Sequence, residues 1–311
     1  MHIEGMLIKE MLAAALLFWP VVVVTITFCF IGTLVFAVFV GSTVAIILLI
    51  AYAFYTGLRE YGWFEWASSR WREWNEKMNT NMRESFKLKE PLDSMDKAAL
   101  YICYPHGLYG FSWFVHFCGC FSEWPAGQGQ RPRLAIHSVF FRIPFVRELM
   151  VYWRCIEATE ESITKVLEGG ESVAIVLGGI EELRHTNSRT PKIVLEKRTG
   201  YARIAARSGV SIIPLFTEGE MELFPAIQSP LWDSIQDFLY KWLHLATPLP
   251  TRKSITAWVS IVKGPLKKPL VTHFLDPVKT EQQSIQDIKA NVRKSLVHFR
   301  TQKNITFDII A

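Results

Sequence analysis

A histidine at the end of a predicted buried strand is the residue best placed for acid–base chemistry. The apolar run 99–103 predicts the strand, and Tyr104-Pro105-His106-Gly107 ends it, because proline and glycine favour a turn. Open α/β sheets bind ligands beyond the carboxyl ends of their strands, where a histidine can accept a proton near neutral pH. His106 is therefore a candidate general base, and the alternative is a turn histidine that only caps a backbone group.

Two further strand ends carry residues that could act with His106. The apolar run 172–177 is followed by Gly178-Gly-Ile-Glu-Glu182, and the run 210–215 leads to Glu220. Because the carboxyl ends of parallel strands meet at one rim, a histidine, one or two carboxylates and glycine N–H groups can converge there. Such a set supplies a general base, an orienting acid and donors for a developing oxyanion.

Basic residues also precede a predicted helix. Lys197-Arg-Thr-Gly-Tyr201 opens the helix expected at 199–208. A helix N-terminus that carries basic residues suits a phosphate group. The sequence therefore predicts a phosphate site beside the rim.

Strands alternate with helices from residue 99 onward, which predicts an α/β fold with a parallel or mostly parallel sheet covered on both faces. The expected strands are 99–103, 134–139, 172–177, 210–215, 254–262 and 270–275. The expected helices are 109–121, 144–151, 159–167, 199–208, 232–245 and 281–300.

Composition narrows the class of protein. The 311 residues carry a formal net charge of +5, which suits an anionic lipid surface or a polyanionic co-substrate. No dense cluster of lysine and arginine with interleaved aromatic residues indicates a nucleic-acid partner. The five cysteines are expected to be reduced thiols. His116, Cys118 and Cys120 lack a distant fourth ligand, so no metal site is predicted.

A long uncharged segment predicts a membrane anchor. No Asp, Glu, Lys or Arg occurs from residue 11 to residue 58, and a helix of that length is more than twice the ~30 Å hydrocarbon core. We therefore expect a hairpin of two membrane helices, at 7–29 and 33–57, with a break near Gly32. Lysines and arginines follow residue 58, so the positive-inside rule places both termini in the cytosol.

These patterns predict three parts of the chain. Residues 1–58 form the membrane hairpin, and residues 99–311 form a domain that faces the cytosol. Between them, residues 59–98 include four tryptophans among charged residues, Trp63, Trp66, Trp71 and Trp74. Such a segment suits the membrane interface, although it could equally be an amphipathic helix packed on the domain.

Five short blocks, in their order, resemble the diacylglycerol acyltransferase type-2 family, which includes monoacylglycerol and wax-alcohol acyltransferases. The blocks are Tyr104-Pro-His-Gly107, Phe141-Arg-Ile-Pro-Phe-Val-Arg-Glu148, Gly178-Gly-x-x-Glu182, Arg198-x-Gly-Tyr201 and Ile213-Pro-Leu-Phe-x-x-Gly-Glu220. They fall within residues 99–225, and the resemblance fades beyond them. The resemblance implies a sheet like that of the glycerolipid acyltransferases, covered by helices.

The resemblance also implies residue roles. His106 matches the family's catalytic histidine, and Glu182 matches a supporting glutamate, with Glu181 as its competitor. The family's animal form usually has a histidine where this chain has Tyr104, which leaves the base in place. The residues implied in substrate binding are Tyr104, Pro105, Gly107, Arg142, Arg147, Gly178, Gly179, Arg198 and Gly200, the three arginines as candidates for CoA phosphates.

The implied reaction transfers a fatty acyl group from acyl-CoA to the hydroxyl of a neutral lipid. Diacylglycerol, giving triacylglycerol, is the first expected acceptor, with monoacylglycerol and long-chain alcohols as alternatives. No cofactor is expected beyond acyl-CoA as co-substrate. The expected location is the endoplasmic reticulum membrane or a lipid droplet, and the sequence leaves open a homo-oligomer.

Three other classes of protein compete with this interpretation. A lysophospholipid acyltransferase would carry an aspartate five residues after its histidine, where this chain has Phe111. A dinucleotide-binding oxidoreductase would need a third glycine and a helix after Gly127-Gln-Gly129. A lipid-droplet scaffold or lipid carrier would explain the hairpin and the tryptophans without any role for His106.

Overall fold

The structure is a computed structural model that describes residues 50–52, 54–55, 76–89, 97–118, 124, 129–183, 190–227, 229–243 and 248–310. The chain forms two compact units. The minor unit comprises residues 1–78 and 137–154, and the main unit comprises residues 79–136 and 155–311.

The predicted membrane hairpin lies almost entirely outside the described residues, and the four tryptophans of the interfacial segment lie outside them altogether. Among the helices that are described, none has the length and apolar character needed to cross a bilayer.

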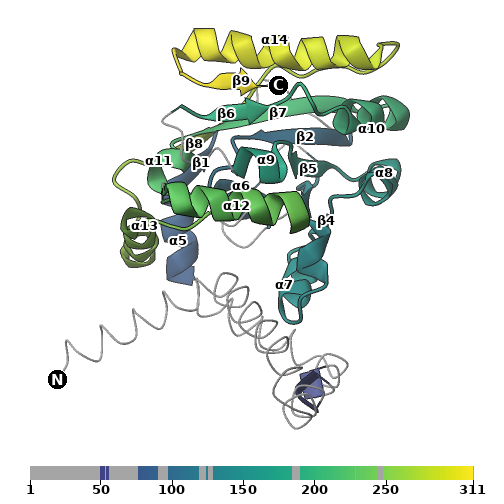
Figure 1. Cartoon of the computed structure of the whole chain (residues 1–311). Coiled ribbons are helices and arrows are strands. Elements are labelled where there is room, and N and C mark those ends of the chain that lie inside the picture. The colour runs from purple at the N-terminus through teal and green to yellow at the C-terminus, as the bar shows by residue number, and fades with distance from the viewer. Residues whose placement is uncertain are drawn as a thin grey trace, which may run out of the picture. The chain divides into compact units, whose positions relative to one another are not determined.

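A mostly parallel sheet of seven strands organises the main unit, in the order β1-β8-β7-β2-β5-β3-β4 (Figure 1). Its strands are β1 (Phe86–Leu88), β2 (Ala99–Tyr104), β3 (Arg133–Ile136), β4 (Ile156–Glu157), β5 (Val173–Val176), β7 (Ser211–Glu218) and β8 (Leu270–Phe274). Every neighbouring pair is parallel except β7 and β8. A separate parallel pair joins β6 (Lys192–Val194) to β9 (Asp308–Ile310).

All but the first of the described helices lie between these strands in sequence. In the main unit they are α6 (Phe111–Phe117), α8 (Glu160–Glu168), α9 (Gly179–Leu183), α10 (Gly200–Ser208), α11 (Glu220–Leu223), α12 (Pro230–Leu243), α13 (Arg252–Lys263) and α14 (Ile285–Lys303). The 3-10 helix η1 (Ser138–Phe141) and α7 (Val146–Tyr152) belong to the minor unit, and α5 (Glu76–Ser85) crosses the boundary between the units.

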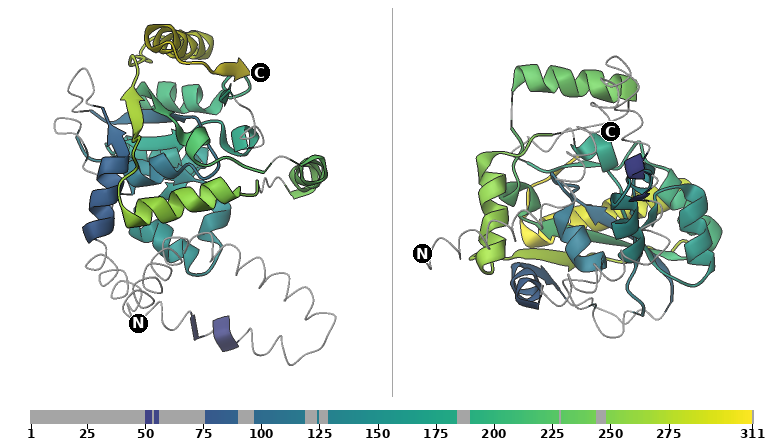
Figure 2. Two further views of the ribbon diagram at one scale, coloured as in Figure 1. Left: turned by 90° about the vertical axis from the view of Figure 1, so that its left-hand side faces the viewer. Right: turned by 90° about the horizontal axis from the view of Figure 1, so that it is seen from below.

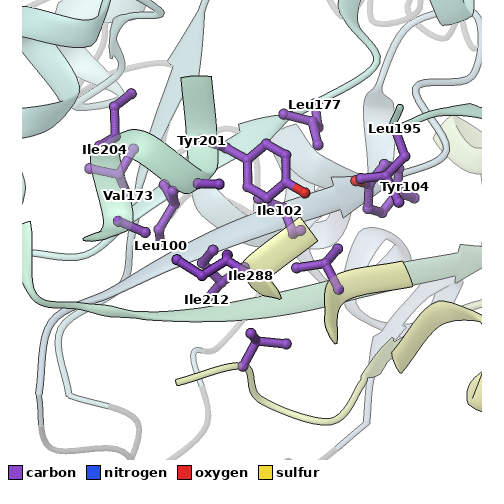
Figure 3. Packing of buried hydrophobic residues seen from close by; sticks show 14 of the residues in the cluster. Leu100, Ile102, Tyr104, Val173, Leu177, Leu195, Tyr201, Ile204, Ile212 and Ile288 are labelled. Carbon is purple, nitrogen blue, oxygen red and sulfur yellow. The ribbon is translucent and has the colours of Figure 1, made fainter. Parts of the chain in front are cut away.

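Helices cover both faces of the sheet. On one face α10 packs on β2 and α14 packs on β7, as Figures 1 and 2 show. The core between them is apolar and includes Leu100 and Ile102 of β2, Ile204 of α10 and Ile288 of α14 (Figure 3). Side chains alternate along a strand, so Tyr101 points to the other face, where its ring meets that of Phe117 in α6 at 6.4 Å between centroids.

The sequence predicted most of this architecture. The strands expected at 99–103, 172–177, 210–215 and 270–275 are confirmed as β2, β5, β7 and β8, and the mostly parallel sheet is confirmed. The strand expected at 134–139 ends at residue 136, because a 3-10 helix follows. The helices expected at 109–121, 144–151, 159–167, 199–208, 232–245 and 281–300 are present, with shifted ends, as α6, α7, α8, α10, α12 and α14.

One predicted strand is wrong. Residues 254–262 lie in helix α13, although isoleucine, valine and tryptophan favour strands there. The buried side chains are Ser254, Ala257, Trp258 and Ile261, a spacing of three and four residues that belongs to a helix. Burial along one side of the segment therefore outweighs its local preference for a strand.

Candidate active site

His106 lies just beyond the carboxyl end of the central strand β2. Gly107, with φ +61°, and Gly110, with φ +60°, adopt backbone conformations that favour glycine and turn the chain into α6. The His106 side chain is half-buried, and its Nδ1 lies 2.9 Å from the carbonyl oxygen of Gly107. A carbonyl oxygen only accepts hydrogen bonds, so Nδ1 carries the proton and Nε2 is left with the lone pair that can accept one.

A buried glutamate holds the backbone of this turn. Glu182 of α9 is 3% exposed, and its carboxylate oxygens accept the backbone N–H of His106 at 2.8 Å and of Val194 at 2.9 Å. Its side chain lies over Gly178, where an added Cβ would be 1.8 Å from Glu182 Cδ. Glycine is therefore required at position 178 for the carboxylate to reach the turn.

The contacts of Glu182 fit a positioning role. Burial raises the pKa of Glu182 to about 8, and the two N–H donors and Arg198 lower it by less than burial raises it. Each carboxyl oxygen accepts one backbone N–H, so Glu182 fixes the turn rather than the imidazole ring.

A second buried carboxylate, Glu220, holds the other end of the same turn. Glu220 is fully buried, and its oxygens accept the backbone N–H of Phe111 at 2.8 Å and of Ser112 at 3.3 Å, as well as the Ser112 hydroxyl. A Cβ at Gly107 would lie 2.5 Å from Glu220 Cγ. Two carboxylates that follow β5 and β7, the strands on either side of β2, thus hold the segment from His106 to Ser112.

The sequence placed Glu220 at the shared rim but gave no catalytic or binding role to it. The available signal was its position at the end of the third strand-end block, after β7. Its contacts could not be read from the sequence, because they depend on the approach of α6 to that strand end.

Replacing Glu220 with alanine is expected to destabilise the main unit. The N–H and hydroxyl of the fully buried Ser112 would lose their acceptor, and one buried donor left unpaired costs about 1–3 kcal/mol. Chemical denaturation measures the free energy of unfolding. Glu222→Ala, an exposed change in the same helix, is the matched control and should leave that free energy nearly unchanged. Equal stability of the two variants would contradict the role given to Glu220.

Burial also determines the acid–base state of His106. It lowers the pKa of His106 from its ordinary value of 6.5, and the hydrogen bond to Gly107 opposes this only in part. The neutral ring needed for a base is thus the main form near pH 7. We expect the kcat/KM of a reaction in which His106 is the base to have an acid limb centred below pH 6.5, where the ring becomes protonated. An acid limb centred above pH 7 in the pH profile of the free enzyme would contradict this assignment.

Glu181 pairs with the basic residues that precede α10. Its carboxylate lies 3.2 Å from Lys197 Nζ and 3.6 Å from Arg198 Nη2. Arg198 Nη2 also donates to the carbonyl oxygen of Gly178, at 3.0 Å. The structure thus brings Arg198, Gly178 and Glu182 to one rim with His106, and of the two glutamates it is Glu182 that contacts the histidine backbone.

The other described residues predicted to bind substrate in the main unit make no hydrogen bond with the His106 side chain. Gly179 follows Gly178 with φ +54°, and Gly200 begins α10 with open space where a Cβ would lie. Pro105 contributes its carbonyl oxygen, which accepts the indole N–H of Trp113 at 3.0 Å. Tyr104 is fully buried in the apolar core, and its hydroxyl has no hydrogen-bond partner. Substrate contact by these residues stays a prediction.

Arg142 and Arg147 belong to the minor unit, whereas His106, Glu182 and Arg198 belong to the main unit. Arg142 is exposed at the end of η1, and Arg147 Nη1 lies 3.2 Å from a carboxylate oxygen of Glu148. Their part in phosphate binding stays a prediction.

His116 is buried and contacts a threonine of β8. Its Nε2 lies 2.8 Å from Thr272 Oγ1, and burial lowers its pKa to about 3. Cys120 lies outside the described residues. Within the part of the chain that the structure describes, no group of three or more histidine, cysteine, aspartate or glutamate side chains could hold a metal ion.

Comparison with known proteins gives three informative relatives. Acyl-CoA wax alcohol acyltransferase 1 of Homo sapiens is 35% identical over 130 residues, 40% of this chain and 39% of that protein. 2-Acylglycerol O-acyltransferase 1 of Mus musculus is 27% identical over 226 residues, 68% of each chain. Diacylglycerol O-acyltransferase 2 of Dictyostelium discoideum is 24% identical over 212 residues, 65% of this chain and 62% of that protein.

The matches to these relatives cover less of each protein than the match to a family model covers of this chain. Matches to the wax alcohol acyltransferases span only 38% to 47% of those proteins. Among solved structures, the 1-acyl-sn-glycerophosphate acyltransferase PlsC of Thermotoga maritima aligns over 82% of this chain and 95% of its own, at 12% identity and a TM-score of 0.43, too low to identify a shared fold. A family model described as diacylglycerol acyltransferase matches residues 36–293, most of the sequence, and the chain therefore belongs to the diacylglycerol acyltransferase family.

Proposed function

We propose that this protein transfers a fatty acyl group from acyl-CoA to the hydroxyl of a neutral lipid, with His106 as the general base. The observation that carries the proposal is the half-buried imidazole of His106 at the end of β2, with Nδ1 on the Gly107 carbonyl and its turn held by two buried carboxylates. Family membership supports the same chemistry, since the relatives' names specify hydroxyl-bearing lipids.

The geometry suggests how the transfer proceeds. Nδ1 of His106 donates to the Gly107 carbonyl, so Nε2 removes the proton from the acceptor hydroxyl. The oxygen then attacks the thioester carbonyl, and N–H groups near Gly107 or at Gly178 and Gly179 are candidates to stabilise the tetrahedral oxyanion. When that intermediate collapses, the carbon–sulfur bond breaks, and the imidazolium returns its proton to the departing CoA thiolate.

Diacylglycerol is the acceptor that we propose first, with triacylglycerol as the product. Monoacylglycerol and long-chain alcohols are the alternatives, because relatives named for all three acceptors resemble the chain. Arg198 of the main unit is proposed to bind a phosphate of CoA, and Arg142 and Arg147 of the minor unit stay predicted phosphate ligands. The predicted hydrophobic hairpin at 1–58 supports a location at the endoplasmic reticulum membrane or a lipid droplet, which is part of the same proposal.

An acceptor panel tests this function. The purified full chain in detergent receives labelled acyl-CoA with diacylglycerol, monoacylglycerol, a long-chain alcohol or lysophosphatidate. We expect ester formation matched by CoA release with at least one of the three neutral acceptors and none with lysophosphatidate. CoA release without an acceptor would indicate a hydrolase, and lipid binding without turnover would indicate a carrier. Either result would overturn the proposal.

A further inference from the structure

The exposed apolar side chains of the main unit are concentrated in one part of the chain. Single exposed apolar residues are normal on a protein surface, but a contiguous group marks a binding surface. Seven of the described large apolar side chains between residues 226 and 255 are exposed: Ile227, Leu231, Ile235, Phe238, Trp242, Leu249 and Ile255. Elsewhere, the described part of the main unit exposes one large apolar side chain, Ile285.

These residues lie in the segment 226–255, which contains α12. A bridge between Ala226 and Pro250 and a hydrogen bond of 2.7 Å from Ile227 N–H to the Leu249 carbonyl close its base. Figure 2, right, shows α12 standing away from the sheet. The helix is not exposed all round, because Gln236 between the exposed residues Ile235 and Asp237 is buried.

The exposed residues of α12 form a single stripe. Leu231, Ile235, Phe238 and Trp242 recur at intervals of four, three and four residues, which places them on one face of the helix. Their exposed fractions reach 74% at Leu231 and 67% at Trp242, so the stripe is open along its length. The rings of Phe238 and Trp242 lie 6.3 Å apart and form its aromatic end.

Charged residues are arranged unevenly around this stripe. Helical spacing places Asp233 and Asp237 on the side of α12 away from the stripe, whereas Lys241 falls beside it. Beyond the helix, Arg252 and Lys253 open α13 next to the exposed Ile255. An apolar stripe with Lys241 beside it and acids behind it is complementary to an anionic lipid surface, and Arg252 and Lys253 add positive charge to the same part of the chain.

We propose that the stripe Leu231, Ile235, Phe238 and Trp242 of α12 inserts into the interface of a membrane that carries anionic headgroups. Tryptophan and phenylalanine are favoured at that depth, and basic side chains beside them reach the phosphates. The contact would hold the main unit on the lipid surface at a point separate from the hydrophobic segment 11–58. It does not depend on the identity of the reaction or of the acceptor.

Site-specific fluorescence tests this contact even though the N-terminal segment is expected to enter membranes by itself. Phe238→Cys and Asp233→Cys, both exposed on α12, are labelled with bimane in the full chain and reconstituted into phosphatidylcholine–phosphatidylserine vesicles. Wild-type protein carried through the same labelling gives the background of the native cysteines. Brominated acyl chains then quench any probe that lies within the bilayer.

We expect a blue-shifted emission at position 238 and quenching at least about twofold stronger there than at position 233, since only one face of an interfacial helix enters the lipid. Quenching at position 238 should weaken when phosphatidylserine is omitted, and more in Lys241→Gln than in the control Lys294→Gln, on α14. Equal quenching at both positions, or none, would overturn the proposal. A blue shift at 238 without lipid that grows with protein concentration would identify a second copy of the chain as the occupant and also overturn it.

Discussion

Gly178→Ala is expected to unfold the main unit far more readily than the wild type and to remove its activity. An alanine Cβ would lie 1.8 Å from Glu182 Cδ, so the carboxylate must leave its position. The N–H groups of His106 and Val194 would then lose their acceptor. At about 1–3 kcal/mol for each buried donor, the expected loss is about 2–6 kcal/mol in the free energy of unfolding.

Chemical denaturation measures this loss, and Gly200→Ala is the matched control. Gly200 begins α10, and no atom lies within 4 Å of the position that its Cβ would take. The same change of one methyl group should therefore alter the free energy of unfolding there by no more than about 0.5 kcal/mol. If Gly178→Ala were as stable as Gly200→Ala, Glu182 would not hold the turn in the way described.

The sequence predicts the strands whose ends carry the site residues, because these strands are apolar runs. The runs that became β2, β5 and β7 are bounded by glycine or proline, so the ends of β2 and β5 were predicted to within one residue, whereas β7 continues past the predicted residue 215 to Glu218. These three strand ends precede His106, Glu182 and Glu220. The topology of parallel sheets then predicted that these ends share a rim, and the structure has this order, with β2 between β5 and β7.

The contacts within the site could not be predicted in the same way. Nothing in the sequence specifies that Glu182 binds the backbone of His106 rather than its ring, because the choice depends on how α9 folds back over Gly178. The apolar pattern likewise gave no sign of β4, which has two residues, since a period cannot be read from so short a segment. In α13 the local preference for a strand was outweighed by tertiary packing.

His106→Ala is expected to lower the rate of acyl transfer by about 10²- to 10⁴-fold, the contribution usual for a positioned general base. The proton acceptor is lost, while the backbone N–H of residue 106 still donates to Glu182. The turn should therefore survive, and the free energy of unfolding should change little. His298→Ala removes an exposed histidine from α14 and should keep full activity, so it serves as the control.

The central claim is that His106 takes the proton from the lipid hydroxyl as that hydroxyl attacks the thioester. Its most direct test is the initial rate of labelled ester formation from acyl-CoA and the preferred neutral acceptor, compared at equal protein concentration for wild type, His298→Ala and His106→Ala. The account predicts equal rates for the first two proteins and a rate at least about 100-fold lower for His106→Ala, with unchanged thermal unfolding. Ester formation by folded His106→Ala at the wild-type rate would contradict it.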